Sequence, residues 1–177
     1  MVATPHMVLG AAIGKAVRRP WLAWPLAFAS HFLLDYIPHL DSHGLFGREQ
    51  GGPTLPEAAV ALADVAVGVV LVGWLVRRQP LGRVMVGGAF FAILIDLLDN
   101  MPLWGDAFTT WPGTAWLSAW HHMSESNVTP DQWLLGVGTQ VTTVVIAMWF
   151  CRSLGRPRLP EEARKGRGLF GSPLEGA

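Results

Sequence analysis

The sequence has little charge, since Asp, Glu, Lys and Arg together make up 15% of its 177 residues, against about 25% in a typical soluble domain. It has one cysteine, Cys151, which excludes an internal disulfide and a cysteine-rich zinc cluster. The formal net charge is zero, so no nucleic-acid partner is expected. Nine tryptophans stand against one tyrosine, and hydrophobic residues make up 51% of the chain. This composition indicates a small integral membrane protein with one domain.

Five apolar stretches predict helices. Four of them, at 21–37, 58–76, 81–98 and 133–150, are near the roughly 20 residues that a membrane-spanning helix needs. The fifth, at 7–17, is shorter, so whether it spans the membrane fully is left open. We therefore predict an all-α integral membrane bundle of about five helices. Thr54 and Glu57 have the spacing of a capping box at the start of one of them.

Two further segments complete the predicted organisation. Residues 115–123 predict a short helix lying on the outer membrane surface, with Trp116 and Trp120 on one face. Residues 1–151 would form the transmembrane domain. The basic, Pro/Gly-rich residues 152–177 predict a disordered cytoplasmic tail.

Basic residues give the predicted orientation. Lysines and arginines gather after the first helix, between the third and fourth, and after the fifth, whereas the segments 39–56 and 101–131 contain only Arg48. The positive-inside rule then places the N-terminus outside and the C-terminus in the cytoplasm. Tryptophans near both ends of the helices are typical of interfacial belts in contact with membrane lipids.

Ionisable residues gather in the outer half of this predicted bundle. His31 and Asp35 share one helix face because they are four residues apart. Ionisable residues within a membrane are functional candidates by default, and imidazole with carboxylate suits zinc, manganese or iron. The expected cofactor is a divalent transition metal, zinc or manganese. Its predicted ligands are His6, His31, Asp35, His39, Asp96, His121 and His122.

Asp64 and Asp99 are the predicted catalytic residues, acting as a general base or orienting a metal ligand. The rings of the adjacent His121 and His122 would diverge on a helix, so we expect at most one of them to point inward.

Each residue also has a purely structural interpretation. His31 and Asp35 could form a hydrogen-bonded pair between helices, Asp64 could bond His31 or a serine, and Asp99 could lie at a solvated helix end. Two other functions therefore stay open: a non-catalytic membrane scaffold with a polar or structural-metal staple, and a small proton-coupled transporter. Against transport, the inner halves of the third and fifth predicted helices are almost purely apolar, so no polar pathway continues to the cytoplasmic side.

Two segments carry a family resemblance: TPHMVLGAAIG at 4–14 and SHFLLDYIPHLD at 30–41, followed by a later segment with His121 and His122. Together they resemble the predicted membrane-bound metal-dependent hydrolases of the YdjM-like group, which are small bacterial membrane proteins. His6 matches the early histidine of that group. Asp35, His39 and Asp41 occupy its second segment, and His121 and His122 stand in for its third without its arginine and spacing.

The resemblance implies a metal site at the face of a bacterial inner membrane, and the orientation predicted from Lys and Arg makes this the outer face. The resemblance also implies a lipid-linked or phosphate-ester substrate. The oligomeric state is left open.

Overall fold

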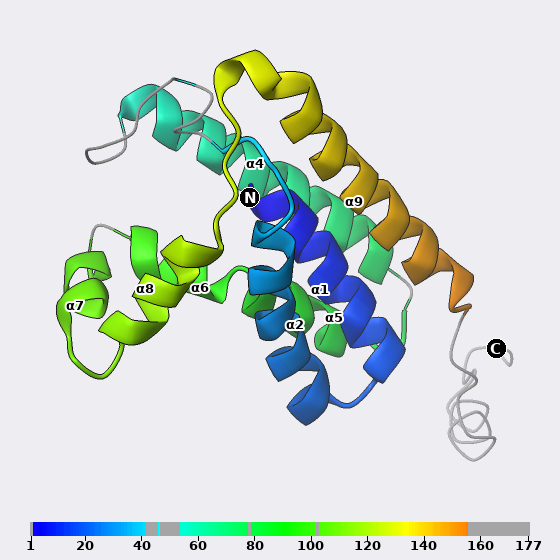
Figure 1. Ribbon diagram of the computed structural model, residues 1–177. Coiled ribbons are helices and arrows are strands. Elements are labelled where there is room, and N and C mark those ends of the chain that lie inside the picture. The colour runs from blue at the N-terminus through cyan, green and yellow to red at the C-terminus, as the bar shows by residue number, and fades with distance from the viewer. Residues whose placement is uncertain (1, 42–45, 47–53, 78, 102, 156–177) are drawn as a thin grey trace, which may run out of the picture.

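The computed structural model describes residues 2–41, 46, 54–77, 79–101 and 103–155, and the regular elements in this part of the chain are all helices, joined by turns and loops (Figure 1). The prediction of an all-α protein is therefore confirmed. In chain order the elements are α1 (Ala3–Val17), α2 (Pro20–Asp35), α4 (Leu55–Val76), α5 (Gly82–Ala92), α6 (Leu94–Asn100), α7 (Gly105–Thr110), α8 (Ala115–Ser124), the 3₁₀ turn η1 (Pro130–Gln132) and α9 (Trp133–Ser153).

The central helix is α1, which packs against α2, α4, α5 and α9. Its contact with α5 is made by glycine backbones. A Cβ atom added to Gly10 would collide with the carbonyl oxygen of Gly88, and one added to Gly88 would collide with that of Gly10. Small residues allow two helices to approach this closely, and the alanines Ala11, Ala12 and Ala89 extend the buried contact.

The bundle helices alternate in direction along the chain. Helices α1, α4 and α9 run one way, and α2 runs in the opposite direction beside α1 (Figure 1). Helix α5 is antiparallel to α1, because Gly10 meets Gly88 while Gly14 meets Val84. This alternation matches the predicted connectivity, although it does not fix which end faces the cytoplasm.

Two helices in the described ranges are long and apolar enough to cross a membrane: α4, and the continuous helical stretch from Pro130 to Ser153. Both turn large apolar side chains outward, such as Val70 and Trp149, which are 69% and 70% exposed. A capping box starts α4 as predicted, with the Thr54 N–H donating to Glu57 Oε2 at 2.5 Å. The spanning of α1, α2 and α5 stays a prediction.

The predicted single helix at 81–98 is wrong in one respect, because the helix is divided at Ile93 (φ −111°, ψ 6°) into α5 and α6. Alone, the 11 residues of α5 would reach only about 16 Å at ~1.5 Å per residue, well short of the ~30 Å hydrocarbon core. The break sends α6 sideways, and α7 and α8 stand beside the bundle (Figure 1).

The predicted short helix at 115–123 is present as α8, and its place on a membrane surface stays a prediction. At the other end of the chain, α9 continues to Ser153, two residues into the predicted tail. Residues 156–177 of that tail lie outside the described residues.

Candidate metal centre

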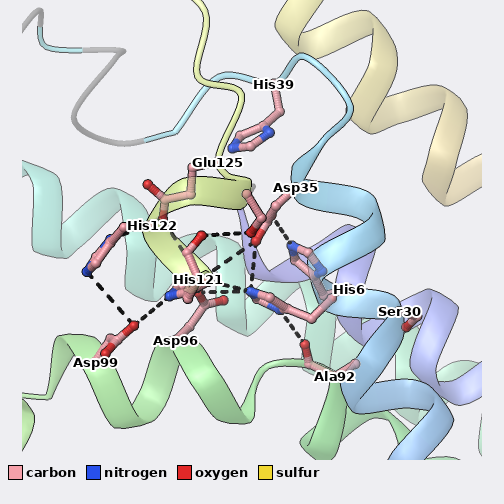
Figure 2. Close-up of polar contacts among 12 residues, drawn as sticks. His6, Ser30, Asp35, His39, Ala92, Asp96, Asp99, His121, His122 and Glu125 are labelled. Atoms are coloured by element: carbon pink, nitrogen blue, oxygen red, sulfur yellow. Dashed lines mark hydrogen bonds and ion pairs between the residues drawn. The ribbon is translucent and has the colours of Figure 1, made fainter. Parts of the chain in front are cut away.

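Ionisable side chains from four helices converge where the end of α2 meets α6 and α8 (Figure 2). In sequence they are 115 positions apart at the extremes, so the fold and not the local pattern brings them together. The members are His6 on α1, His31 and Asp35 on α2, Asp96 and Asp99 on α6, and His121 on α8.

The end of α8 is held against α2 by backbone hydrogen bonds. Ser126 N–H donates to the Asp35 carbonyl at 2.9 Å, and His39 N–H donates to the Ser126 carbonyl at 3.0 Å. On the same side, the Trp120 ring stacks on Phe32 with 4.5 Å between ring centroids. These contacts fix the position from which His121 reaches the centre.

Two imidazole nitrogens face each other at the middle of the cluster, with His31 Nε2 3.1 Å from His121 Nε2. Asp35 Oδ2 lies 2.9 Å from the first and 3.6 Å from the second. Asp96 Oδ1 lies 3.5 Å and 3.4 Å from the same two atoms. Ligand atoms about 2.0–2.2 Å from a tetrahedral zinc ion are roughly 3.3–3.6 Å apart. The distances above are close to this range, and His31, Asp35 and His121 form one of the groups that could hold a metal ion.

The other nitrogen of each ring is held by an acceptor outside the centre. His31 Nδ1 lies 2.6 Å from the Ala92 carbonyl oxygen, and His121 Nδ1 lies 2.5 Å from Asp99 Oδ2. Both partners only accept hydrogen bonds, so each Nδ1 donates and each Nε2 is directed into the centre. A carbonyl or carboxylate behind the ring is the usual support of a metal-ligating histidine.

The charge around His121 is strongly negative. Burial alone would lower the pKa of the imidazole, but hydrogen bonds and charge from Asp96 and Asp99 outweigh burial and raise this pKa to about 10. His121 is therefore protonated at neutral pH when no cation is bound. The cluster attracts positive charge, which a proton or a metal ion can supply.

His6 adds a further donor at the buried side. Its ring stacks on His31 with 4.0 Å between centroids, and its Nε2 lies 3.2 Å from Asp35 Oδ1. His6, His31 and Asp35 are fully buried. The Nδ1 atom of His6 has no hydrogen-bond partner within the part of the chain that the structure describes.

Among the described residues, the centre is partly exposed at two carboxylates. The side chain of Asp96 is 28% exposed, and that of Glu125 is 30% exposed. Glu125 Oε1 lies 3.9 Å from His121 Nε2. A small molecule would meet the cluster here, between α6 and the end of α8.

Of the predicted ligands, the structure brings together five: His6, His31, Asp35, Asp96 and His121. His121 is buried and His122 is 56% exposed. The two rings do not diverge as predicted, because their centroids are 5.4 Å apart and His122 Nε2 lies 4.0 Å from the Asp99 Oδ2 atom that His121 also contacts (Figure 2). His39 is buried close by, with Nδ1 2.8 Å from the Ile37 carbonyl, and its Nε2 has no hydrogen-bond partner among the described residues.

The two predicted catalytic residues are separated. Asp99 lies behind His121 and contacts its Nδ1. Asp64 instead accepts a hydrogen bond from the Thr4 N–H at 3.0 Å, and its carbonyl accepts one from the Thr4 hydroxyl at 2.7 Å. It therefore ties the start of α1 to α4, and it takes no direct part in the cluster.

Sequence reasoning missed Glu125 and Ala92. Glu125 follows His121 by four residues and His122 by three, so helical spacing was an available signal. Ala92 acts through its backbone carbonyl, for which the sequence contains no signal.

No family model matches the chain, and no curated protein or solved structure is significantly similar to it. The functional argument therefore rests on the geometry of the centre.

Proposed function

We propose that the protein is a membrane-bound, metal-dependent hydrolase whose centre holds zinc or manganese on His31, His121, Asp35 and Asp96. The observation that supports this best is the facing pair of Nε2 atoms, 3.1 Å apart. Two rings whose Nδ1 atoms are both engaged by acceptors can share a cation between their Nε2 atoms. The surrounding carboxylates supply the charge and the remaining donors.

The membrane location is part of the proposal. Helices α4 and α9 would cross the bilayer, and α1, α2 and the α5–α6 pair would complete the bundle. The N-terminus would lie outside a bacterial inner membrane, as in the YdjM-like proteins that the sequence resembles. The metal centre would then lie at the outer face.

The chemistry follows from the charges and the two partly exposed carboxylates. A bound divalent ion would supply Lewis acidity and a more acidic water. Asp99 would hold the His121 ring in place, and His6 would orient the Asp35 carboxylate. Glu125, which is partly exposed beside His121, would accept a proton as general base. A phosphate-ester or lipid-linked substrate, delivered from the outer leaflet, would suit this position.

The complete burial of His6, His31 and Asp35 favours a second candidate, a scaffold stapled by a structural metal. Such a metal would join α1, α2, α6 and α8 and would not need an open position. The two candidates agree on the metal and differ on activity.

Metal content tests the proposal. We expect purified protein to contain close to one zinc or manganese ion per chain by inductively coupled plasma mass spectrometry. His31→Ala and His121→Ala should each lose most of it, because each removes one of the two facing donors. The matched control is His122→Ala, which removes the adjacent exposed histidine and should retain the metal.

A folded wild-type protein that takes up neither zinc nor manganese on reconstitution would overturn the proposal. If metal is present, turnover of phosphodiester and lipid-linked substrates separates the candidates. Loss of turnover in Glu125→Gln with metal retained would support the hydrolase, and absence of turnover in loaded wild type on every such substrate would leave the structural staple.

A further inference from the structure

A hollow lies at the end of the bundle where α1, α4 and α9 finish (Figure 1), and three basic residues line it. They are Lys15, Arg77 and Arg152, and the hollow has a volume of about 360 Å³. Its other described walls include Trp74, Gln79 and Cys151.

Lys15 is the residue that most needs an explanation. It is only 4% exposed, and its Nζ donates a hydrogen bond of 2.7 Å to the Cys151 carbonyl. A carbonyl oxygen carries no full charge, and buried charges are normally paired. Within the described ranges, no carboxylate forms an ion pair with any of the three basic residues of the hollow.

The two arginines add to the same positive field. Their guanidinium carbons lie 5.6 Å (Arg77) and 5.0 Å (Arg152) from the centroid of the Trp74 ring. Cation–π contact with one ring holds both groups in place but neutralises neither. The hollow also contains a buried acceptor, Gln79 Oε1, with no hydrogen-bond partner in the described part of the chain.

We infer that this hollow binds the headgroup of an anionic phospholipid of the phosphatidylglycerol type. The phosphate would lie among Lys15, Arg77 and Arg152, and a headgroup hydroxyl would donate to Gln79 Oε1. A zwitterionic headgroup carries the same phosphate charge but adds a cationic group, which the three basic side chains would repel. Basic pockets between helices at the cytoplasmic surface recognise anionic headgroups in this way.

The position of the hollow selects a lipid as the source of the phosphate. It lies at the ends of α4 and α9, the two helices that are long and apolar enough to cross a membrane. Trp149, three residues before Arg152 on α9, is largely exposed and offers an apolar surface for an acyl chain. The inference depends on the membrane location of these helices and does not depend on the metal centre.

Lipid binding to the full chain in detergent tests the inference, with native mass spectrometry following titration of phosphatidylglycerol or phosphatidylcholine. The double variant Arg77→Gln/Arg152→Gln changes exposed side chains, so the fold should persist. We expect its apparent affinity for phosphatidylglycerol to fall by at least about tenfold. The matched control Arg83→Gln, an exposed arginine at the same end of the bundle, should bind like wild type.

Equal binding of both lipids by wild type, or unchanged phosphatidylglycerol binding by the double variant, would overturn the inference. Lys15→Met gives a second variant and should also weaken binding. Competition by free glycerol 3-phosphate at similar concentration would identify a soluble anion site and reject the lipid. Metal content, measured on the same samples, should be the same in these variants as in wild type, so a failure of the lipid inference can be told apart from a failure of the metal proposal.

Discussion

Both ring nitrogens of His121 have contacts, so the role of each contacting residue can be tested by mutation. Nε2 faces His31, while Nδ1 contacts Asp99 at 2.5 Å. Asp99 does not reach the middle of the centre in this arrangement. Its effect on a metal would pass through the orientation and basicity of the His121 ring.

Replacement of Asp99 by Asn should therefore weaken metal binding without removing the site. We expect affinity to fall by roughly 10- to 100-fold, the usual effect of losing a group behind a ligating histidine. Competition with a chelator measures the affinity, and the number of ions bound at saturating metal should stay at the wild-type value. The matched control is Asp64→Asn, whose side chain bonds Thr4 and whose metal affinity should not change. Unchanged affinity in Asp99→Asn would contradict this role.

At the scale of single residues, the sequence was informative where spacing is local. The four-residue interval between His31 and Asp35 correctly predicts that they meet, with 2.9 Å between Nε2 and Oδ2. The partner of Asp64 could not be predicted, because it depends on how α1 packs on α4. For the same reason, Asp99 and Asp64 looked equivalent in the sequence.

Between elements, the α1–α5 contact depends on the missing side chain of Gly88. A Cβ atom there would collide with the carbonyl oxygen of Gly10, which belongs to a helix backbone and cannot move independently. Gly88→Ala should therefore destabilise the protein by about 1–3 kcal/mol, the usual cost of overpacking.

Thermal unfolding in detergent measures this effect. The matched control is Gly138→Ala on α9, where an added Cβ would meet nothing within 4 Å. We expect that control to be neutral or to gain up to about 1 kcal/mol from helix propensity. Equal unfolding temperatures for the two variants would show that the close approach of α1 and α5 contributes nothing to stability.

The division of the 81–98 stretch into α5 and α6 could not be predicted from its sequence. Residues 92–95 are Ala, Ile, Leu and Ile, without a proline or glycine to mark the break. Tertiary contacts offer the reason, since the Ala92 carbonyl at the break bonds His31 and the redirected α6 brings Asp96 and Asp99 to the centre. Local propensity favours one long helix, and these long-range contacts outweigh it.

For the whole molecule, the proposed orientation gives a labelling test. In a Cys151→Ser background, Pro112→Cys and Pro80→Cys each place one thiol at an exposed proline position. Pro112 lies between α7 and α8 and should face outward, whereas Pro80 lies between α4 and α5 and should face the cytoplasm. A membrane-impermeant maleimide added to intact spheroplasts should label the first variant and not the second.

Permeabilised cells provide the control, because both thiols should then react. The reverse pattern would place the histidine centre in the cytoplasm and reject the orientation inferred from Lys and Arg.

The connectivity and the alternating direction of the bundle helices could be predicted from the sequence, because each depends on long apolar stretches that the sequence shows directly. The lateral position of α7 and α8 could not be predicted, since it follows from the break at Ile93.

The proposed centre would take its donors from residues 31, 35, 96 and 121, with His6 beside Asp35, and this has a consequence for biogenesis. During synthesis, α1 and α2 emerge well before α8, so a nascent chain has His6 and His31 long before it has His121. An ion could then be captured tightly only once the last of these segments has been translocated and folded back onto α2. With the proposed orientation, the ion would come from the pool outside the cell membrane, so the metal supply of that compartment, and not of the cytoplasm, would limit maturation.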